Sequence, residues 1–229
     1  FDHIKQYVVG DDVRSINWKA TSRRNELMIN HYEDEKSQAV YCILDKSRVM
    51  NMPFNELSLL DYSINASLVV ANSALQHQDK IGLITFSDVL GNVLPAANNT
   101  NQLNKINETL YNQKHRDTEA NYKLLFYSLK KLTRKRSLFF LFTNFESMPA
   151  LDRQLDVILG LAKKHVLVVI FFENTELESL VAEDAEDLQA IYHKTIAEKF
   201  SLEKRLMQKE LQKYGIQTIL TKPEELTVN

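Results

Sequence analysis

The sequence has few of the residues on which common catalytic and cofactor sites depend. Only one of its 229 residues is cysteine and five are glycine, and neither a G-x-G-x-x-G nor a G-x-x-x-x-G-K-[ST] motif occurs. The missing glycine motifs argue against a nucleotide site of either common type. The single cysteine, Cys42, excludes an internal disulfide, and its apolar neighbours argue against a reactive thiol. No G-x-S-x-G motif is present, and no histidine has a second histidine or a cysteine at helical spacing.

Long apolar runs and an excess of one charge are also missing. The chain has 28 basic and 30 acidic residues, a net charge of −2, so no overall field favours nucleic acid or an anionic membrane. No apolar run reaches the roughly 20 residues of a membrane-spanning helix. The chain opens on "FDHIKQY" without an initiator Met or a signal peptide, and we expect a fragment of a longer, cytoplasmic protein.

Short apolar runs alternate with segments of helical spacing. Runs of strand length that are apolar throughout are typical of parallel strands covered on both faces. They lie at 39–45, 80–87, 136–144, 165–173 and 215–220, with helical segments at 55–77, 119–132, 150–163 and 184–213. The alternation predicts an α/β fold, with a doubly wound, mostly parallel sheet flanked by helices. We expect the last helical segment as one helix, or as two with a break near Ser201.

Two further segments complete the predicted organisation. Residues 89–96 are expected to form a hairpin at one edge of the sheet, with Gly91-Asn92 at its turn. Residues 1–36 have little apolar periodicity until 27–35, which alternate as a strand or hairpin arm does. We therefore expect an irregular and β-containing N-terminal extension at 1–36, followed by a domain at 37–229.

Polar side chains are predicted at the carboxyl ends of the strands, where ligands gather in open α/β sheets. Asp45 and Ser47 follow the first strand, Thr118 lies in a loop before a helix, and Asn144 follows a later strand. This arrangement resembles the von Willebrand factor type A fold. The metal-ion-dependent adhesion site of that fold takes D-x-S-x-S from the first loop, Thr from the second and Asp from the third.

The N-terminal segment carries a more specific resemblance. Residues 7–23, "YVVGDDVRSINWKATSR", resemble the motif Y-x-x-G-D-D-x-R-x-I-x-W-x-A-x-A-R of a bacterial family, domain of unknown function number fifty-eight. The matching residues are Tyr7, Gly10, Asp11, Asp12, Arg14, Ile16, Trp18, Ala20 and Arg23, and Ser22 stands where the family usually has Ala. The resemblance implies a type A-like domain that often follows two membrane helices and is often encoded beside a MoxR-type AAA+ ATPase. It therefore implies a location at the cytoplasmic face of the inner membrane, with any membrane contact made through segments absent from this sequence.

The sequence departs from the type A pattern at the metal site. The first loop is Asp45-Lys46-Ser47-Arg48-Val49, so an apolar side chain replaces the second serine, and Asn144 replaces the third-loop Asp. A hard divalent cation loses a hydroxyl ligand and a negative charge by these changes. We expect no cofactor, with weak Mg²⁺ or Mn²⁺ binding as the alternative. Without a metal, Asp45 is expected to accept hydrogen bonds from Ser47, Thr118 and backbone N–H groups.

The N-terminal motif has two interpretations. In the first it is scaffold: Ile16 and Trp18 pack against the sheet, and an aspartate of the Gly-Asp-Asp turn pairs with Arg14 or Arg23. In the second, Asp11, Asp12 and Arg14 face a partner. The basic run 130–136 could bind phosphate or nucleic acid, but its place at a helix end and its lack of interleaved aromatic residues favour a simple charge complement to the helix dipole.

Two functions follow from these observations. The first is a non-enzymatic interaction domain that docks a protein, with a MoxR-type AAA+ ATPase as the implied partner and no nucleic acid. The apolar residues Phe145 and Met148, beside the altered metal loop, suit a protein contact. The second is a metal-dependent hydrolase that uses Asp45, Asp117 and Glu119 around a cation.

Overall fold

The computed structural model of the chain describes residues 3–31, 37–54, 56–173 and 188–223. The chain forms two compact units, Phe1–Ser37 and Gln38–Asn229. Their boundary falls one residue after the expected one. The expected residues 32–35 of the first unit's strand and 184–187 of the last helix lie outside the described residues.

The N-terminal unit is a small hairpin with two short helical segments. Strand β1 (His3–Gln6) pairs antiparallel with β2 (Met28–His31), and η1 (Val13–Ser15) and α1 (Trp18–Arg24) lie between them in sequence. Helix α1 begins where the Asn17 side chain accepts a hydrogen bond from the Ala20 N–H at 3.0 Å. The same Asn17 donates to Asn30 Oδ1 at 2.8 Å, which ties the helix start to β2. This unit is the irregular and β-containing extension that the sequence predicts.

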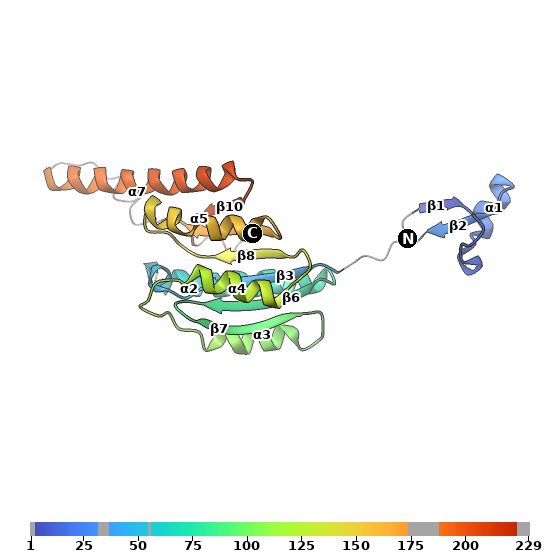
Figure 1. Cartoon of the computed structure of the whole chain (residues 1–229), viewed down its shortest axis with the longest axis horizontal. Coiled ribbons are helices and arrows are strands. Elements are labelled where there is room, and N and C mark those ends of the chain that lie inside the picture. The colour runs from blue at the N-terminus through green and yellow to red at the C-terminus, as the bar shows by residue number, and fades with distance from the viewer. Residues whose placement is uncertain (1–2, 32–36, 55, 174–187, 224–229) are drawn as a thin grey trace. The chain divides into compact units, whose positions relative to one another are not determined.

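The larger unit is built on one six-stranded sheet with the order β10-β9-β8-β3-β6-β7 (Figure 1). The five parallel strands are β3 (Ala39–Asp45), β6 (Lys80–Phe86), β8 (Leu138–Phe142), β9 (Val166–Phe172) and β10 (Gln217–Thr221). Strand β7 (Leu90–Ala97) pairs antiparallel with β6 at one edge. The predicted α/β fold with a mostly parallel, doubly wound sheet is confirmed.

The described helices cover both faces of this sheet. One face carries α2 (Leu59–Gln76) and α3 (Gln102–Tyr111), and the other carries α4 (Tyr122–Leu132), α5 (Met148–Ala162) and α7 (Leu188–Lys213). Short elements η2 (Arg48–Met50), β4 (Pro53–Phe54) and β5 (Leu57–Ser58) connect β3 to α2. Helix α7 runs unbroken through Ser201, and α3 was not anticipated. Among the described helices, none is both long and apolar enough to cross a membrane.

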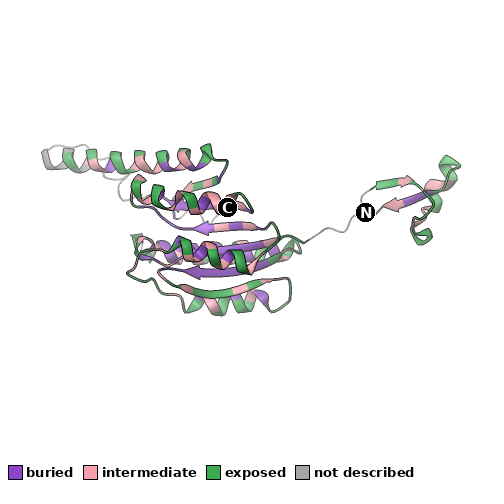
Figure 2. Ribbon diagram, in the orientation of Figure 1, coloured by how far each residue is buried: buried purple, intermediate pink, exposed green. Residues whose placement is uncertain are grey.

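The core consists of two layers, one on each face of the sheet. Alternate residues of β3 divide between them: Cys42 and Leu44 pack toward α2, whereas Tyr41 and Ile43 pack toward α4 and α5. Figure 2 shows the buried residues concentrated in the central strands. Burial raises the pKa of the Cys42 thiol to about 12, so this cysteine is a protonated core side chain, as its apolar neighbours indicate.

The predicted hairpin at 89–96 is wrong in its turn. Gly91 and Asn92 lie inside β7, and the β6–β7 connection is made by the residues around Asp88. A Cβ atom on Gly91 would overlap with the Thr85 hydroxyl, which instead accepts a hydrogen bond from the Asn92 N–H at 2.9 Å. Gly91 therefore serves the close approach of two strands rather than a turn.

Candidate functional site

Asp45 is the last residue of β3 and is fully buried. Its Oδ1 accepts a hydrogen bond from the Ser47 N–H at 2.8 Å, and its Oδ2 accepts one from Thr143 Oγ1 at 2.7 Å. Burial raises the pKa of the Asp45 carboxyl, and the Ser47 and Thr143 hydrogen bonds oppose that rise. The carboxyl therefore links the end of β3 to its own loop and to the loop after β8.

Thr143 connects Asp45 to a buried tyrosine. Tyr122 Oη lies 2.6 Å from Thr143 Oγ1, and because Thr143 gives its one hydroxyl proton to Asp45, Tyr122 is the donor in this pair. Burial, reinforced by the Asp45 charge, raises the pKa of Tyr122 well above its ordinary value. The Tyr122–Thr143–Asp45 chain is a buried hydrogen-bond network that stabilises the carboxylate, and its two hydroxyl residues were not identified from the sequence. The pairing of Leu44 with Phe142 places Asp45 beside Thr143, so the strand order was the missing signal.

Ser47 contributes its backbone more than its side chain. Its hydroxyl is buried and forms no hydrogen bond of acceptable geometry within the described part of the chain, although its closeness to Asp45 helps to lower the pKa of that carboxyl. A small cavity of about 60 Å³ lies at this point, lined by Asp45, Ser47, Val49 and Asn144 among others. Val49, which takes the place of the second serine of the type A motif, presents an apolar wall there.

Thr118 does not reach Asp45, contrary to expectation. Its hydroxyl donates to Asp88 Oδ1 at 3.0 Å, in the β6–β7 connection. Arg116 Nε lies 3.0 Å from the same carboxylate oxygen. The Ser87 hydroxyl, and after it Thr118 and Arg116, lower the pKa of Asp88. Thr118 therefore belongs to a separate, partly exposed cluster, and its carbonyl contacts the first loop by accepting a hydrogen bond from the Arg48 N–H at 3.0 Å.

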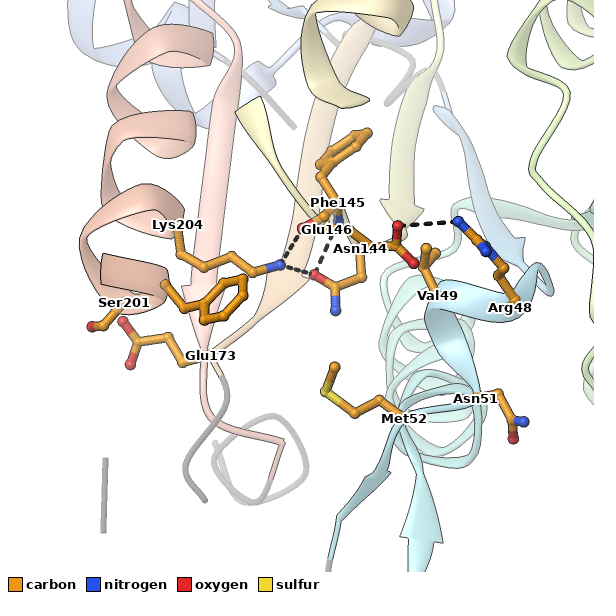
Figure 3. A pocket seen from close by; sticks show the side chains of 11 residues that line it. Arg48, Val49, Asn51, Met52, Asn144, Phe145, Glu146, Glu173, Ser201 and Lys204 are labelled. Atoms are coloured by element: carbon orange, nitrogen blue, oxygen red, sulfur yellow. Dashed lines mark hydrogen bonds and ion pairs between the residues drawn. The ribbon is translucent and has the colours of Figure 1, made fainter. Parts of the chain in front are cut away.

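Asn144 meets a lysine from a distant helix. Lys204 of α7 donates to Asn144 Oδ1 and, at 2.5 Å, to the carbonyl oxygen of Phe145. Figure 3 shows Lys204 reaching from its helix toward Asn144, with Val49 and Met52 across the hollow. Burial lowers the pKa of Lys204 from 10.5 to about 8, while Glu203 and Glu146 partly oppose this shift. A side-chain cation thus contacts the third loop, where the type A pattern has a metal-ligating aspartate.

The neighbouring residue of α7 fastens the same loop. Glu203 Oε1 accepts a hydrogen bond from the Met148 N–H, the first of helix α5, at 2.9 Å. The preceding Ser147 makes no side-chain cap, so Glu203 supplies the negative group that a helix N-terminus favours. Glu203 and Lys204 together hold α7 against the third loop. The sequence did not predict this contact, because Glu203 and Lys204 are two of many charged residues in α7.

The expected metal-site residues do not fit a divalent cation as they are arranged. Both oxygens of Asp45 have donors, the Thr118 hydroxyl is directed to Asp88, and Asn144 Oδ1 accepts from the Lys204 ammonium group. Mg²⁺ and Mn²⁺ prefer several oxygen ligands, including one or two free carboxylates. Nowhere in the described ranges do three His, Cys, Asp or Glu residues come together as a ligand set. Asp117 and Glu119, the other acids of the hydrolase hypothesis, have side chains that are 83% and 72% exposed.

A larger cavity of about 600 Å³ opens beside these loops (Figure 3). We call it the third-loop pocket; its lining includes Val49, Met52, Asn144, Phe145, Phe200 and Lys204. Met52 and Phe200 keep 41% and 43% of their surface exposed. Arg48 lies 3.2 Å from Glu146 and 3.7 Å from Glu119, so ion pairs join the three loops at the outer side. The pocket combines apolar walls with a polar rim.

The apolar contact expected from Phe145 is wrong. Phe145 is only 3% exposed, stacks on Tyr122 with ring centroids 6.1 Å apart, and meets Phe171 edge-on at 6.4 Å. Met148 is half-buried and packs on the same core. The accessible apolar side chains at this edge are instead those of Met52 and Phe200.

The N-terminal motif divides between turn formation and exposure. Gly10 has φ +111°, a conformation that favours glycine. Asp11 accepts from the Val8 N–H at 3.0 Å and pairs with Lys5 at 3.1 Å, and Asp12 accepts from the Arg14 N–H at 3.0 Å. The expected pairing of an aspartate with the Arg14 or Arg23 side chain does not occur among the described residues of this unit, where Lys5 pairs with Asp11 instead.

Other motif residues lie exposed on the same unit. Ile16 bridges to Ile29, whereas the Trp18 side chain is 70% exposed, and the Arg14 and Arg23 side chains are also exposed. Within the unit the motif is therefore scaffold at Gly10, Asp11 and Asp12, and accessible surface at Arg14, Trp18 and Arg23.

The strand order and the loops at the strand carboxyl ends define a von Willebrand factor type A-like α/β domain. Residues 3–189 match the family described as "Protein of unknown function DUF58". Because the match covers both units and most of the chain, the chain belongs to this family. No curated protein matches the sequence.

The comparison with solved structures supports the fold through one neighbour with a TM-score above 0.5. An aerotolerance-related membrane protein from Bacteroides fragilis is 13% identical with a TM-score of 0.51, and the alignment covers 83% of this chain and 94% of that one. BatB from Bacteroides thetaiotaomicron is 14% identical with a TM-score of 0.49, over 78% and 99% of the two chains. The SpRpn10 VWA domain is 12% identical with a TM-score of 0.48, over 83% and 92%. At these identities the Bacteroides fragilis protein supports the fold alone.

Proposed function

We propose that the chain is a non-enzymatic protein-interaction domain and that the third-loop pocket is its contact surface. The observation that carries this proposal is the bond from Lys204 to Asn144 and Phe145. A lysine ammonium at the third loop repels a metal ion but leaves the pocket beside it open. In a type A domain this surface binds its ligand through a metal ion, whereas here we infer that side chains make the contact without an ion.

The composition of the pocket suits a protein ligand. Met52 and Phe200 expose large apolar surface on a cavity of about 600 Å³, and Arg48 and Glu146 form a polar rim. Exposed apolar side chains around a hollow, rimmed by charges, are typical of sites that accept an anchoring side chain of a partner. Helix α7 forms one wall and the loop after β3 forms the other, so the partner contacts both.

A MoxR-type AAA+ ATPase is the partner that the family resemblance suggests. The resemblance also suggests work at the cytoplasmic face of the inner membrane, through segments outside this sequence, and one structural neighbour is itself described as an aerotolerance-related membrane protein. A net charge of −2 gives no support for nucleic acid as a partner.

The hydrolase alternative lacks support from the geometry. It requires Asp45, Asp117 and Glu119 around one cation, but Asp45 is fully buried and bonded, whereas the other two side chains are largely exposed. Phosphoester and peptide assays with added Mn²⁺ check it: turnover that disappears in Asp45→Asn would favour the hydrolase.

Affinity capture tests the proposed function. The whole chain, immobilised, should retain a MoxR-type ATPase, and Phe200→Glu should abolish retention. Val69→Glu is the matched control, since Val69 is an exposed apolar residue of α2 on the other face of the sheet, 51% exposed. Failure to retain the ATPase, with or without nucleotide, contradicts the partner; equal loss in both variants contradicts the pocket.

A further inference from the structure

Another cavity lies at the end of the parallel strands opposite to Asp45. It has a volume of about 410 Å³ and forms where α4 and α5 end and where β8 and β9 begin. Its lining includes Phe126, Lys130, Arg134, Leu161, Lys164 and His165. Strands β8 and β9 are parallel to β3, so their amino ends lie at this end of the sheet, whereas Asp45 lies at the carboxyl end. The cavity is therefore separate from the third-loop pocket.

The cavity concentrates positive charge without a balancing acid. Lys130, Arg134 and Lys164 line it, and its lining contains no Asp or Glu. Within the described residues none of the three cations forms an ion pair. Two arginines at the carboxyl ends of the strands are paired instead: Arg48 with Glu146, and Arg116 with Asp88. Three unpaired cations around one hollow attract an anion.

Helix ends explain only part of this charge. Lys130 lies in the last turn of α4, where a cation complements the helix dipole. Helix α5 has no basic residue in its last turn, and Lys164 and Arg134 lie beyond the last residues of the two helices. Their convergence on one cavity comes from the packing of α4 against α5 and not from either helix alone.

The inner surface of the cavity is apolar and aromatic. Phe126 and Leu161 line it, and the His165 ring is 7% exposed and stacks on Phe139 with centroids 4.4 Å apart. A Cβ atom on Gly160 would come within 3.0 Å of the Phe126 ring, so glycine lets this ring lie against α5. His165 Nδ1 is buried and has no hydrogen-bond partner among the described residues. Buried polar atoms without a partner are uncommon in folded proteins, so a ligand in the cavity could satisfy this one.

We propose that this cavity binds a small organic phosphate, with the phosphate on Lys130, Arg134 and Lys164 and the organic part against Phe126 and Leu161. Arg and Lys are the residues that hold phosphate groups by charge-assisted hydrogen bonds. The volume lies within the range of small-molecule sites, roughly 300–1,000 Å³. The cavity has no glycine-rich loop, so this is a phosphate site of neither common nucleotide type. The proposal is independent of the partner at the third-loop pocket.

Calorimetry on the whole chain tests this site with three probes: adenosine triphosphate, tripolyphosphate and adenosine. Adenosine triphosphate should bind saturably, tripolyphosphate more weakly because it lacks an organic part, and adenosine not at all. The double variant Lys130→Ala/Arg134→Ala should weaken the nucleotide by about tenfold or more, since hydrogen bonds to charged groups are lost.

The control is Lys135→Ala/Arg136→Ala, from the same basic run but outside the lining of the cavity. It removes one lysine and one arginine, as the cavity variant does, and should change the affinity by less than about threefold because neither side chain lines the cavity and the charges are screened by solvent. NMR signals of the His165 ring should shift on nucleotide binding in the control and not in the cavity variant. Equal weakening in the two variants, equal affinity for tripolyphosphate and the nucleotide, or no nucleotide binding overturns the proposal.

Discussion

Lys204 donates a hydrogen bond to Asn144 although 60 residues separate them in sequence. The contact joins α7 to the loop after β8, and the adjacent Glu203 accepts from Met148 N–H at 2.9 Å in the same region. The third loop of this type A-like domain is therefore held by a helix, through a side-chain cation.

The first prediction concerns the pH dependence of stability. Burial lowers the pKa of Lys204 to about 8 from 10.5, so between these pH values the unfolded chain binds a proton that the folded chain does not. Lys204 should consequently add a contribution to the free energy of unfolding that rises with pH across this window, and Lys204→Met should lack that contribution. Urea unfolding of both proteins at several pH values measures the difference, in which the contributions of Cys42 and Tyr122 cancel.

Two results separate this account from a general effect of losing a lysine. Lys209→Met removes an exposed lysine from the same helix and serves as the control. In Glu203→Gln, the NMR titration midpoint of Lys204 should fall further, because the Glu203 charge raises the pKa of Lys204. A Lys204 midpoint at or above 10.5 in the wild type would contradict the buried contact.

The second prediction concerns the network around Asp45. Asp45→Ala removes the acceptor for the Ser47 N–H and the Thr143 hydroxyl, and each buried donor left unsatisfied costs about 1–3 kcal/mol, so stability should fall by about 2–6 kcal/mol. Chemical unfolding measures the loss. Asp156→Ala, an exposed carboxyl of α5, should change stability by less than about 0.5 kcal/mol.

The charge of Asp45 adds a pH signature. Its pKa is raised from 3.8, so the folded chain binds more protons than the unfolded one above pH 3.8, and stability falls as pH rises through the raised pKa. Asp45→Asn cannot ionise and should lose that fall. If the two proteins show parallel pH profiles, the carboxyl is not a buried, neutralisable group.

The third prediction concerns metal binding. Titration of the wild type with Mg²⁺ or Mn²⁺ should give no saturable heat, because Val49 and Asn144 each stand in place of a type A ligand and Lys204 contacts the third loop. The triple variant Val49→Ser/Asn144→Asp/Lys204→Ala restores the serine and the aspartate and removes the ammonium, and it should bind Mn²⁺ measurably. Saturable micromolar binding by the wild type that Asp45→Ala abolishes would contradict this interpretation.

The fold was predictable because it depends on local sequence patterns, namely apolar runs of strand length and apolar residues at helical spacing. Apolar runs such as 165–173 and the helical spacing of 150–163 identified β9 and α5 within a few residues. Helix α3 was not predicted because it is mostly polar, with buried Ile106 and Leu110 as its main apolar contacts. The turn predicted at Gly91-Asn92 was wrong because glycine, which favours a turn, also permits the close approach of β7 to Thr85.

The site was predictable in position and not in its bonds. Asp45, Ser47 and Asn144 do meet at the strand carboxyl ends, lining one small cavity. The Thr118 hydroxyl donates to Asp88 and not to Asp45 as expected. Thr143, Tyr122 and Lys204 contribute hydrogen bonds at the site, and no sequence pattern predicted their roles. Such partners depend on strand order and on how α7 returns over the sheet, and neither is encoded in local spacing.

The most direct test of the account is the affinity of the nucleotide-free MoxR-type ATPase for the whole chain, measured by interferometry with Mg²⁺ and with a chelator. The account predicts the same Kd under both conditions, and a loss of at least about tenfold for Phe200→Glu, since truncation of an interface anchor typically costs 2 kcal/mol or more. Binding that requires Mg²⁺, or that survives Phe200→Glu unchanged, would contradict an interaction made by the third-loop pocket without an ion.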